Sequence, residues 1–158
     1  MRAAGGAIAL ANLKGGCGKS TLALNLAAGL ARRGSVALVD ADPQGALRHW
    51  VDWAAERRGL PQMLAGEGDP LASLSEALRT HRYVVVDCPP SLDMRVTGQI
   101  LEHVQSVLIP VLPSPLDLWA SAGTVEAVQH ARRVNPALRA WQARFEAAAL
   151  PLARSTIA

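Results

Sequence analysis

The sequence predicts an α/β fold, a three-layer sandwich in which helices cover both faces of a mostly parallel sheet. Two observations support this prediction. First, short apolar runs alternate with segments of helical periodicity along the chain. Second, these runs are rich in Val, Leu and Ala and have the length of buried strands. Strands that alternate with helices indicate right-handed βαβ units, and ligands of such folds bind at the carboxyl ends of the strands.

The elements follow in order along the chain. Apolar runs predict four buried strands, over residues 7–12, 35–42, 83–87 and 106–112. Helical patterns fill the segments between and after them, over residues 20–34, 46–54, 71–81, 94–102 and 118–134. The apolar face of the first helix is expected at Leu22, Leu26, Ala27 and Leu30, and Gly34 is expected to stop it.

Loops and turns connect these elements. Gly and Pro residues over 59–70 indicate a loop that could include a short strand. Residues 88–93 are expected to form a rigid loop, and residues 113–117 a turn. Near the end of the chain, Trp141, Phe145 and Ala149 are spaced four residues apart. This spacing predicts a short helix.

Composition limits the classes of protein that the chain can belong to. A length of 158 residues suits one domain, and the net charge of +3 permits contact with nucleic acid but does not require it. The two cysteines, Cys17 and Cys88, form no CxxC pair or Cys/His cluster, which argues against a zinc site or a disulfide framework. We find no signal peptide, membrane-length apolar run or basic amphipathic tail. We therefore expect a cytoplasmic protein without a membrane partner.

A glycine-rich loop follows the first strand. Gly15, Gly16 and Gly18 allow the backbone to turn its N–H groups inward, as a phosphate site requires. Lys19 would place a cation on the β- and γ-phosphates, and Ser20 would open the helix and offer a hydroxyl to Mg²⁺. The loop has an unusual second lysine at position 14.

Carboxylates end the second and third predicted strands. Asp40 and Asp42 alternate, so both are expected on one side of the strand tip, and Pro43 turns the chain back toward the phosphates. Asp87 ends a strand of valines and would hold Mg²⁺ through water.

These motifs together resemble those of the ParA/MinD superfamily. The segment Lys-Gly-Gly-x-Gly-Lys-Ser-Thr at 14–21 is similar to the deviant Walker A motif of that family, "DADPQ" to its switch I, and "YVVVDCPPSLD" to its Walker B and switch II. The resemblance implies a P-loop NTPase fold, ATP and Mg²⁺. It implies nucleotide-binding roles for Lys14, Gly15, Gly16, Cys17, Gly18, Lys19, Ser20 and Thr21.

The resemblance also implies more specific roles. Lys14 would cross a dimer interface and touch the phosphates held by the other subunit, in the manner of an arginine finger. Asp42 would orient the attacking water, and Ser20, Asp40 and Asp87 would serve the metal. Gln44 would help to hold the switch. Candidates near the interface, from the segment after the fourth strand, are Pro113, Ser114, Pro115 and Asp117. Trp119 is expected to be a packing residue, and Cys17 and Cys88 small buried ones.

The function implied is that of a ParA-like partition ATPase. Mg-ATP would drive a sandwich homodimer that binds DNA nonspecifically, and a centromere-binding or activating partner protein would stimulate the hydrolysis that resets it. Such a protein would be cytoplasmic and associated with the nucleoid. Arginines that could contact phosphate backbones are Arg32, Arg33, Arg132, Arg133 and Arg139.

Two alternatives remain open. The chain could be a cargo-positioning ATPase switch of the same type that does not act on DNA, or a nucleotide-binding remnant without turnover. The resemblance covers residues 7–139, after which family members usually continue with a strand that carries an Asn beside the adenine. We therefore expect a single domain over residues 1–158 that is incomplete after about residue 139.

Overall fold

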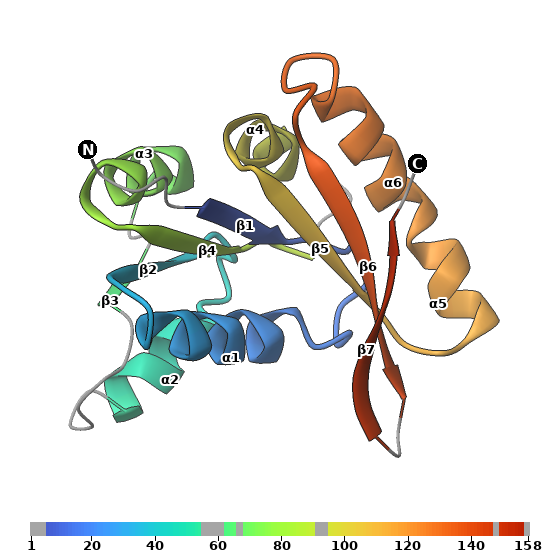
Figure 1. The fold of residues 1–158 in the computed structure, drawn as a ribbon, viewed down its shortest axis with the longest axis horizontal. Coiled ribbons are helices and arrows are strands. Elements are labelled where there is room, and N and C mark those ends of the chain that lie inside the picture. Colours follow the sequence, from blue (N-terminus) through green and yellow to red (C-terminus); the bar gives the residue numbers. More distant parts are fainter. Residues whose placement is uncertain (1–5, 55–61, 66–67, 91–94, 147–148, 157–158) are drawn as a thin grey trace.

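A central sheet with helices on both faces forms the molecule (Figure 1). The computed structural model describes residues 6–54, 62–65, 68–90, 95–146 and 149–156. The strands are β1 (Gly6–Leu10), β2 (Val36–Asp40), β3 (Gln62–Ala65), β4 (Tyr83–Asp87), β5 (Ser106–Val111), β6 (Arg139–Glu146) and β7 (Ala149–Thr156). The helices are α1 (Lys19–Ala31), α2 (Ala46–Ala54), α3 (Pro70–Thr80), α4 (Arg95–His103), α5 (Pro115–Ala120) and α6 (Ala122–Ala131).

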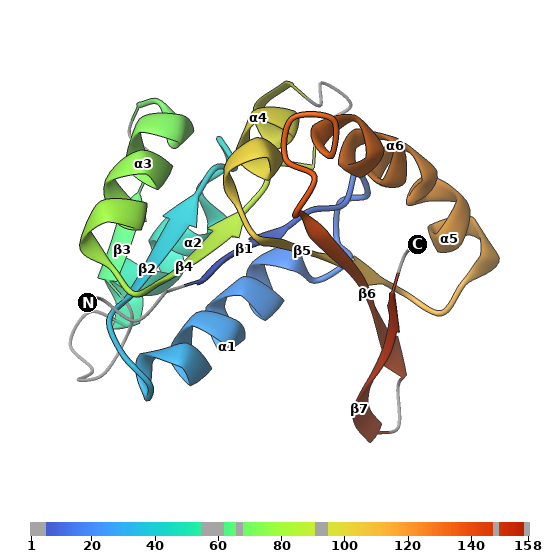
Figure 2. The same ribbon diagram turned by 45° about the horizontal axis from the view of Figure 1, so that its top comes forward.

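The sheet has the order β3-β2-β4-β1-β5-β6-β7. All neighbouring strands from β3 to β6 are parallel, and β7 pairs antiparallel with β6. Helices α1 and α2 cover one face, and α3, α4 and α6 cover the other (Figures 1 and 2). This confirms the three-layer α/β sandwich and its mostly parallel sheet.

The central strands are buried on both faces because each contributes side chains to two cores. In β4, Val84 and Val86 pack with α3 and α4, whereas Val85 lies between them in sequence and packs with α1 on the opposite face. In β2, Val39 and Leu38 divide in the same way. Alternating side chains of a strand point to opposite faces, so a continuous apolar run is what a doubly covered strand requires.

Helix α1 packs against the sheet through a stripe that overlaps the predicted one. Ala27 is buried as expected, and Ala23 and Leu24 are buried beside it. Leu22, Leu26 and Leu30 are only partly buried against the same core. The helix ends at Ala31, three residues before Gly34. Small side chains at Ala23 and Ala27 let the helix approach the sheet closely, which moves the larger leucines to the flanks.

The region 118–134 is helical up to Ala131, as predicted, but two helices occupy it instead of one long helix. Pro115 begins α5 within the expected turn, as proline favours the first position of a helix. Ser121 then separates α5 from α6, and its hydroxyl donates a hydrogen bond of 2.8 Å to the carbonyl of Asp117. Such a bond from Ser to the residue four positions earlier bends helices, and here it marks the junction.

The predicted helix over 141–149 was also wrong. Residues of this segment form strand β6, which pairs with β5 over six consecutive positions from Ser106↔Arg139 to Val111↔Arg144. The pairing to β5 overrides the local helical spacing, as tertiary context often does for short segments. The short strand expected within 59–70 is present as β3, and the rest of that segment lies largely outside the described residues.

No helix within the described ranges combines the length and the apolar character that crossing a membrane would require.

Candidate nucleotide-binding site

The loop between β1 and α1 has the backbone of a phosphate cradle. Gly16 has a φ of 73° and Gly18 a φ of 87°. These values lie in the left-handed region, which residues with a Cβ rarely adopt. The turn of the chain at these two glycines leads directly into α1, whose first residue is Lys19. The start of α1 therefore adds the partial positive charge of a helix N-terminus to the loop.

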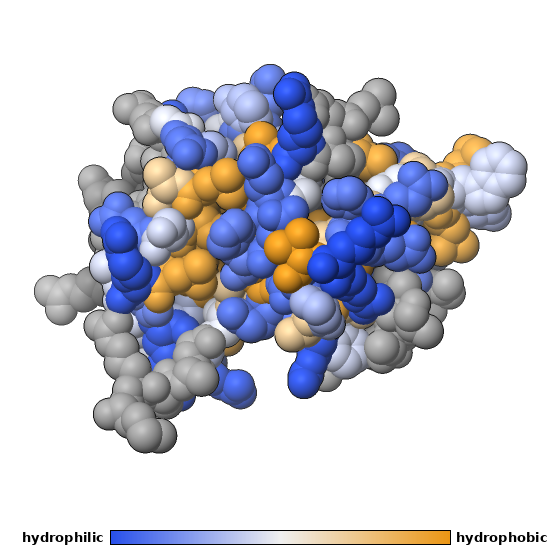
Figure 3. All heavy atoms as spheres, turned by 90° about the horizontal axis from the view of Figure 1, so that it is seen from above, coloured by the Kyte–Doolittle hydropathy of each residue, from blue (hydrophilic) through white to orange (hydrophobic). Residues whose placement is uncertain are grey.

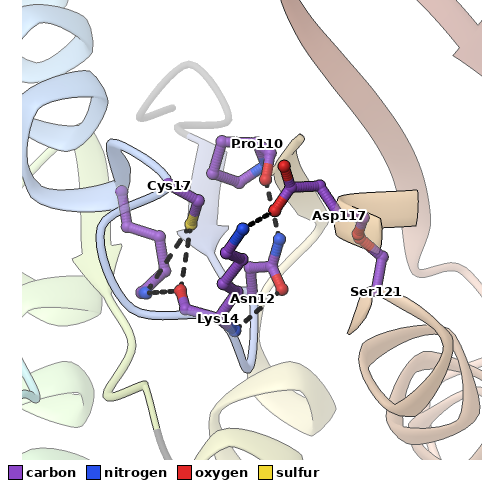
Figure 4. Close-up of polar contacts among 7 residues, drawn as sticks. Asn12, Lys14, Cys17, Pro110, Asp117 and Ser121 are labelled. Atoms are coloured by element: carbon purple, nitrogen blue, oxygen red, sulfur yellow. Dashed lines mark hydrogen bonds and ion pairs between the residues drawn. The ribbon is translucent and has the colours of Figure 1, made fainter. Parts of the chain in front are cut away.

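Lys19 lies inside this loop. The residue is 6 % exposed, and its Nζ donates a hydrogen bond of 3.1 Å to the carbonyl oxygen of Lys14. The Sγ of Cys17 lies 3.9 Å from the same nitrogen, and its thiol donates to the carbonyl of Lys14 (Figure 4). The ammonium of Lys19 has three N–H donors, and its strongest partner here is one backbone oxygen. Lys19 can therefore also donate to an anion bound in the loop.

Lys14 points the other way, toward α5. Its Nζ forms an ion pair with the Oδ1 of Asp117, and the two side chains differ in exposure, at 39 % for Lys14 and 6 % for Asp117 (Figure 4). The two lysines of the loop are thus separated, one inside the loop and one at its outer edge. Of the four candidates after the fourth strand, Asp117 reaches the loop, while Pro113 and Pro115 are exposed and Ser114 makes no side-chain cap.

The first half of the loop is held by residues that the sequence did not single out. Asn12 is 3 % exposed, accepts a hydrogen bond of 3.1 Å from the N–H of Lys14 and donates one of 2.8 Å to the carbonyl of Pro110. The N–H of Leu13 donates to the Oγ1 of Thr124 on α6, at 3.1 Å. An Asn at the end of an apolar strand was the one feature of the sequence that could have indicated this role. Its partners could not be predicted, because they depend on the pairing of β1 with β5.

The two strand-end carboxylates lie side by side. Strands β2 and β4 are neighbours, and their register pairs Asp40 directly with Asp87. Asp87 accepts a hydrogen bond of 2.5 Å from the hydroxyl of Ser20 through Oδ2. Its Oδ1 and the Oδ2 of Asp40 are buried and accept no hydrogen bond from the described residues. The sequence placed both acids at the same edge of the sheet, but only the strand order makes them adjacent.

Burial dominates the electrostatics of this pair. It raises the pKa of Asp87 to about 6, and the negative charge of Asp40 acts in the same direction, while the Ser20 hydroxyl and Lys19 oppose the change. Burial also raises the pKa of Asp40. Two desolvated carboxylates with unpartnered oxygens are stabilised by a cation, and such groups with raised pKa values gather at functional sites.

The chemistry of these donors fits magnesium. Hard oxygen ligands suit Mg²⁺, which keeps several waters and takes one or two carboxylates together with phosphate oxygens. Ser20, Asp87 and Asp40 offer such oxygens beside the phosphate loop. The described part of the chain holds no group of three or more His, Cys, Asp or Glu that could enclose a metal without a phosphate.

Asp42 lies where the chain turns after β2. Its N–H donates to the Oδ1 of Asp40 at 3.1 Å, and its own Oδ1 accepts from the N–H of Gln44 at 2.9 Å. Gly45 completes the turn with a φ of 63°. Asp40, Asp42 and Gln44 line a cleft of about 530 Å³, and Pro89 and Pro90 also line it. The carboxylate of Asp42 is half-buried and borders this open volume.

Other predicted residues have plainer surroundings. Thr21 is exposed on the first turn of α1, where its carbonyl accepts from the side chain of Asn25. Cys17 and Cys88 are buried as expected, and burial raises the pKa of the Cys88 thiol, which keeps it protonated. Trp119 was wrongly predicted to be a packing residue, because 83 % of it is exposed.

A glycine-rich loop at the start of a helix, with a buried lysine and strand-end carboxylates beside it, defines a nucleotide-binding protein of the P-loop class. The family described as CobQ/CobB/MinD/ParA nucleotide binding domain matches residues 8–140, and the chain belongs to this family. The match begins and ends within one residue or so of the range over which the sequence motifs resemble it.

Two curated relatives and one solved structure illustrate the similarity. The maintenance of carboxysome distribution protein A of Halothiobacillus neapolitanus is 55% identical over 135 residues, which cover 84% of this chain and 62% of that protein. The chromosome-partitioning ATPase Soj of Thermus thermophilus is 38% identical over an alignment of 165 residues, gaps included. That alignment covers 84% of this chain and 65% of Soj. The chain thus spans less than two thirds of the length of these relatives.

The solved structure is cobyrinic acid a,c-diamide synthase from Mycobacterium smegmatis, crystallised with an ATP analog and magnesium. It superposes with a TM-score of 0.75 over 92% of this chain and 75% of that one, at 21% identity. At this identity the likeness concerns the fold. It confirms the α/β architecture that the sequence predicted.

Proposed function

We propose that the chain is an ATP-hydrolysing switch that forms a dimer when Mg-ATP binds. The observation that carries this proposal is the separation of the two lysines of the loop. Lys19 is buried within the loop and serves the phosphates of its own subunit, together with the N–H groups of residues 15–21. Lys14 lies at the outer edge, and it serves the phosphates of a second subunit.

The carboxylates have separate roles in this proposal. Ser20 and Asp87 hold Mg²⁺, with Asp40 behind it, and the metal neutralises charge on the β- and γ-phosphates when bound. Asp42 orients the attacking water from its place in the cleft. The raised pKa of Asp87 fits such a role, because a cation would supply the counter-charge that its buried oxygen lacks.

The client of the switch is a protein cargo that must be distributed within the cell. The relative from Halothiobacillus neapolitanus, named for the distribution of carboxysomes, supports this client with 55% identity. Segregation of a plasmid or chromosome is the second candidate, and the 38% identity to Soj favours it. Either client needs an activating partner protein that stimulates hydrolysis.

Nonspecific DNA binding by the dimer remains a prediction. Arg32, Arg33, Arg133 and Arg139 are exposed, whereas Arg132 is half-buried and donates to the carbonyl of Leu138. The affinity of a phosphate-contacting surface falls steeply with salt. If these arginines contact DNA, cosedimentation with DNA will need ATP and will decline as salt is raised.

The solution mass of the Asp42→Ala variant tests the switch. Loss of the hydrolytic carboxylate should slow turnover by about 10²- to 10⁴-fold and trap the triphosphate state. We expect a dimer with Mg-ATP and a monomer with Mg-ADP, and we expect the additional Lys14→Ala change to abolish the dimer. A variant that binds Mg-ATP and stays monomeric would contradict the proposal.

A further inference from the structure

The phosphate loop begins with a residue that is unusual at this position. In the common motif, G-x-x-x-x-G-K-[ST], the first residue is Gly, whereas this chain has Leu13 there. Leu13 is half-buried, and its φ is not positive. A leucine at the start of the loop needs space beside it, and the structure shows that α6 provides this space.

Gly123, the second residue of α6, lies directly against the side chain of Leu13. A Cβ added to Gly123 would be 2.4 Å from the Cδ1 of Leu13, which is closer than such atoms approach. Apart from the backbone of α6 and the two chain neighbours, Leu13 is the only described residue within 4 Å of that Cβ. Gly123 has no positive φ, and glycine is a poor helix residue. The contact with Leu13, and not the backbone conformation, therefore accounts for a glycine here.

Thr124, the next residue of α6, holds the backbone of Leu13. Its Oγ1 accepts a hydrogen bond of 3.1 Å from the N–H of Leu13, and the residue is 0 % exposed. The face that α3, α4 and α6 cover carries many hydrophilic side chains on its outside, whereas the hydroxyl of Thr124 lies on the inner side of α6 (Figure 3). Buried hydroxyls need a partner, and the loop supplies it. We call Gly123 and Thr124 the α6 seat.

The α6 seat is connected to the buried cation of the loop through one residue. Leu13 is followed by Lys14, whose N–H donates to Asn12 and whose carbonyl accepts from the Nζ of Lys19 at 3.1 Å. A displacement of Leu13 would therefore move the carbonyl that Lys19 contacts. The seat acts on Lys19 through the backbone of Lys14, and it does so without a contact of its own to the phosphates.

We propose that Gly123 and Thr124 are positioning residues of the nucleotide site, which hold Leu13 in place and thereby set where Lys19 meets the phosphates. The inference rests on the proposed function, because it takes this loop to bind the phosphates of Mg-ATP. It adds to that function the part of α6 that orders the loop. A loop that is held before the nucleotide arrives loses less conformational freedom on binding, and its affinity is higher for that reason.

Two changes that compensate each other test the contact with Leu13. Gly123→Val fills the space of the Leu13 side chain with a branched group, whereas an alanine could be avoided by rotation of the leucine. We expect the affinity for Mg-ATP to fall by about tenfold or more, because residues in contact are strongly coupled. In the double variant Leu13→Ala/Gly123→Val the space is restored, and the affinity should return to within about threefold of that of Leu13→Ala. Calorimetry at concentrations below dimerisation gives these values.

Gly29→Val is the matched control. Gly29 lies in α1, is exposed, and would carry a Cβ with nothing within 4 Å. The same change in a helix without a neighbouring loop residue should leave the affinity for Mg-ATP unchanged. Urea unfolding of each variant without nucleotide shows whether it is folded under the conditions of the calorimetry.

A second pair of variants tests Thr124 and does not depend on the folding of Gly123→Val. Thr124→Ser keeps the hydroxyl and should bind Mg-ATP within about twofold of the parent. Thr124→Val has a similar shape but leaves the N–H of Leu13 without its acceptor, so we expect its affinity to fall by about fivefold or more. Rescue by serine would show that the hydroxyl, and not the packing of α6, holds the loop.

Three results would overturn the inference. The first is a Gly123→Val variant that binds Mg-ATP like the parent, the second is a loss of affinity that Leu13→Ala does not relieve, and the third is equal affinity of Thr124→Ser and Thr124→Val. A parent chain that does not bind Mg-ATP would instead reject the proposed function, and the inference with it. The parent has an intact α6 seat, so its behaviour distinguishes that failure from failure of the seat alone.

Discussion

The two halves of the nucleotide loop are anchored in different ways. The first half is tied to β5, α5 and α6 through Asn12, Leu13 and the Lys14–Asp117 ion pair, which is open to solvent on the lysine side. The second half is tied to β4 by a hydrogen bond from Ser20 to a carboxylate of Asp87 that is almost fully buried. One anchor can be released at small cost, and the other cannot.

This difference separates two tasks. A residue that must serve a second subunit needs an anchor from which it can depart, whereas a residue that holds the metal needs a fixed position. The partly exposed ion pair suits the first task, and the buried hydrogen bond suits the second. Three changes can break or sharpen this comparison.

The largest effect is expected at Asp87. Its pKa in the folded chain, about 6, lies above the ordinary value of 3.8, so the folded state binds this proton more tightly than the unfolded state does. The resulting stabilisation is fully present below pH 4 and is lost as the pH rises through 6, by about 3 kcal/mol if the whole difference applies. We expect Asp87→Asn to remove this loss.

The measurement is urea unfolding of the parent and of Asp87→Asn at pH values from 4 to 7.5, without nucleotide or magnesium. The difference between their free energies of unfolding isolates Asp87 from the histidines and the remaining acids. Equal pH dependence in both chains would contradict a desolvated carboxylate at this position. Addition of Mg-ATP at pH 7.5 should stabilise the parent more than the variant.

The next effect is expected at Lys19. Removal of a charged hydrogen-bond donor from the phosphates costs about 1.5–3 kcal/mol, so Lys19→Ala should weaken Mg-ATP binding by roughly 10- to 100-fold. Lys14→Ala is the matched control from the same loop, and the affinity of its monomer should remain within about threefold of the parent. Calorimetry at concentrations below dimerisation gives both values. Equal losses would show that both lysines serve the same phosphates.

The smallest effect is expected at Asp117. A partly exposed ion pair contributes about 0.2–1 kcal/mol, so Asp117→Asn should release Lys14 and tighten the Mg-ATP dimer by up to about fivefold. Sedimentation in the Asp42→Ala background measures this change. Glu126→Gln, which removes an exposed carboxylate on α6, serves as the control. A weaker dimer would mean that Asp117 contributes to the interface itself.

Much of the sheet and most of the candidate site could be predicted from the sequence. The strands before and after the phosphate loop and the Asp87 strand have local signals, because they are short, apolar and bounded by turn residues. The order of the strands has no such signal. The adjacency of Asp40 and Asp87, and the anchoring of Asn12 to Pro110, depend on pairings between strands that are far apart in sequence.

The errors have the same origin. The spacing of Trp141 and Phe145 favours a helix locally. Residues 139–144 instead pair with the edge of β5, and this pairing makes them a strand. Trp119 was expected to be a packing residue, yet Asp117 is the residue of α5 that is buried and contacts Lys14. A helix that buries its acid and exposes its tryptophan reverses the usual pattern. The burial of Asp117 depends on its ion pair with Lys14, a contact between segments far apart in the chain that local spacing does not reveal.

The four central strands β2, β4, β1 and β5 have one further consequence. Their residues are buried nearly throughout, and their amides are paired in a parallel ladder. Such amides exchange with solvent deuterium only when the whole sheet opens, whereas loops exchange through local fluctuations. Loading of nucleotide stabilises the folded state as a whole, so it would slow exchange in these strands by the gain in global stability. In the segments that follow β1, β2 and β5, exchange would also slow through direct contact with the nucleotide. Comparison of the two kinds of segment therefore separates the gain in global stability from the local response at the carboxyl edge of the sheet.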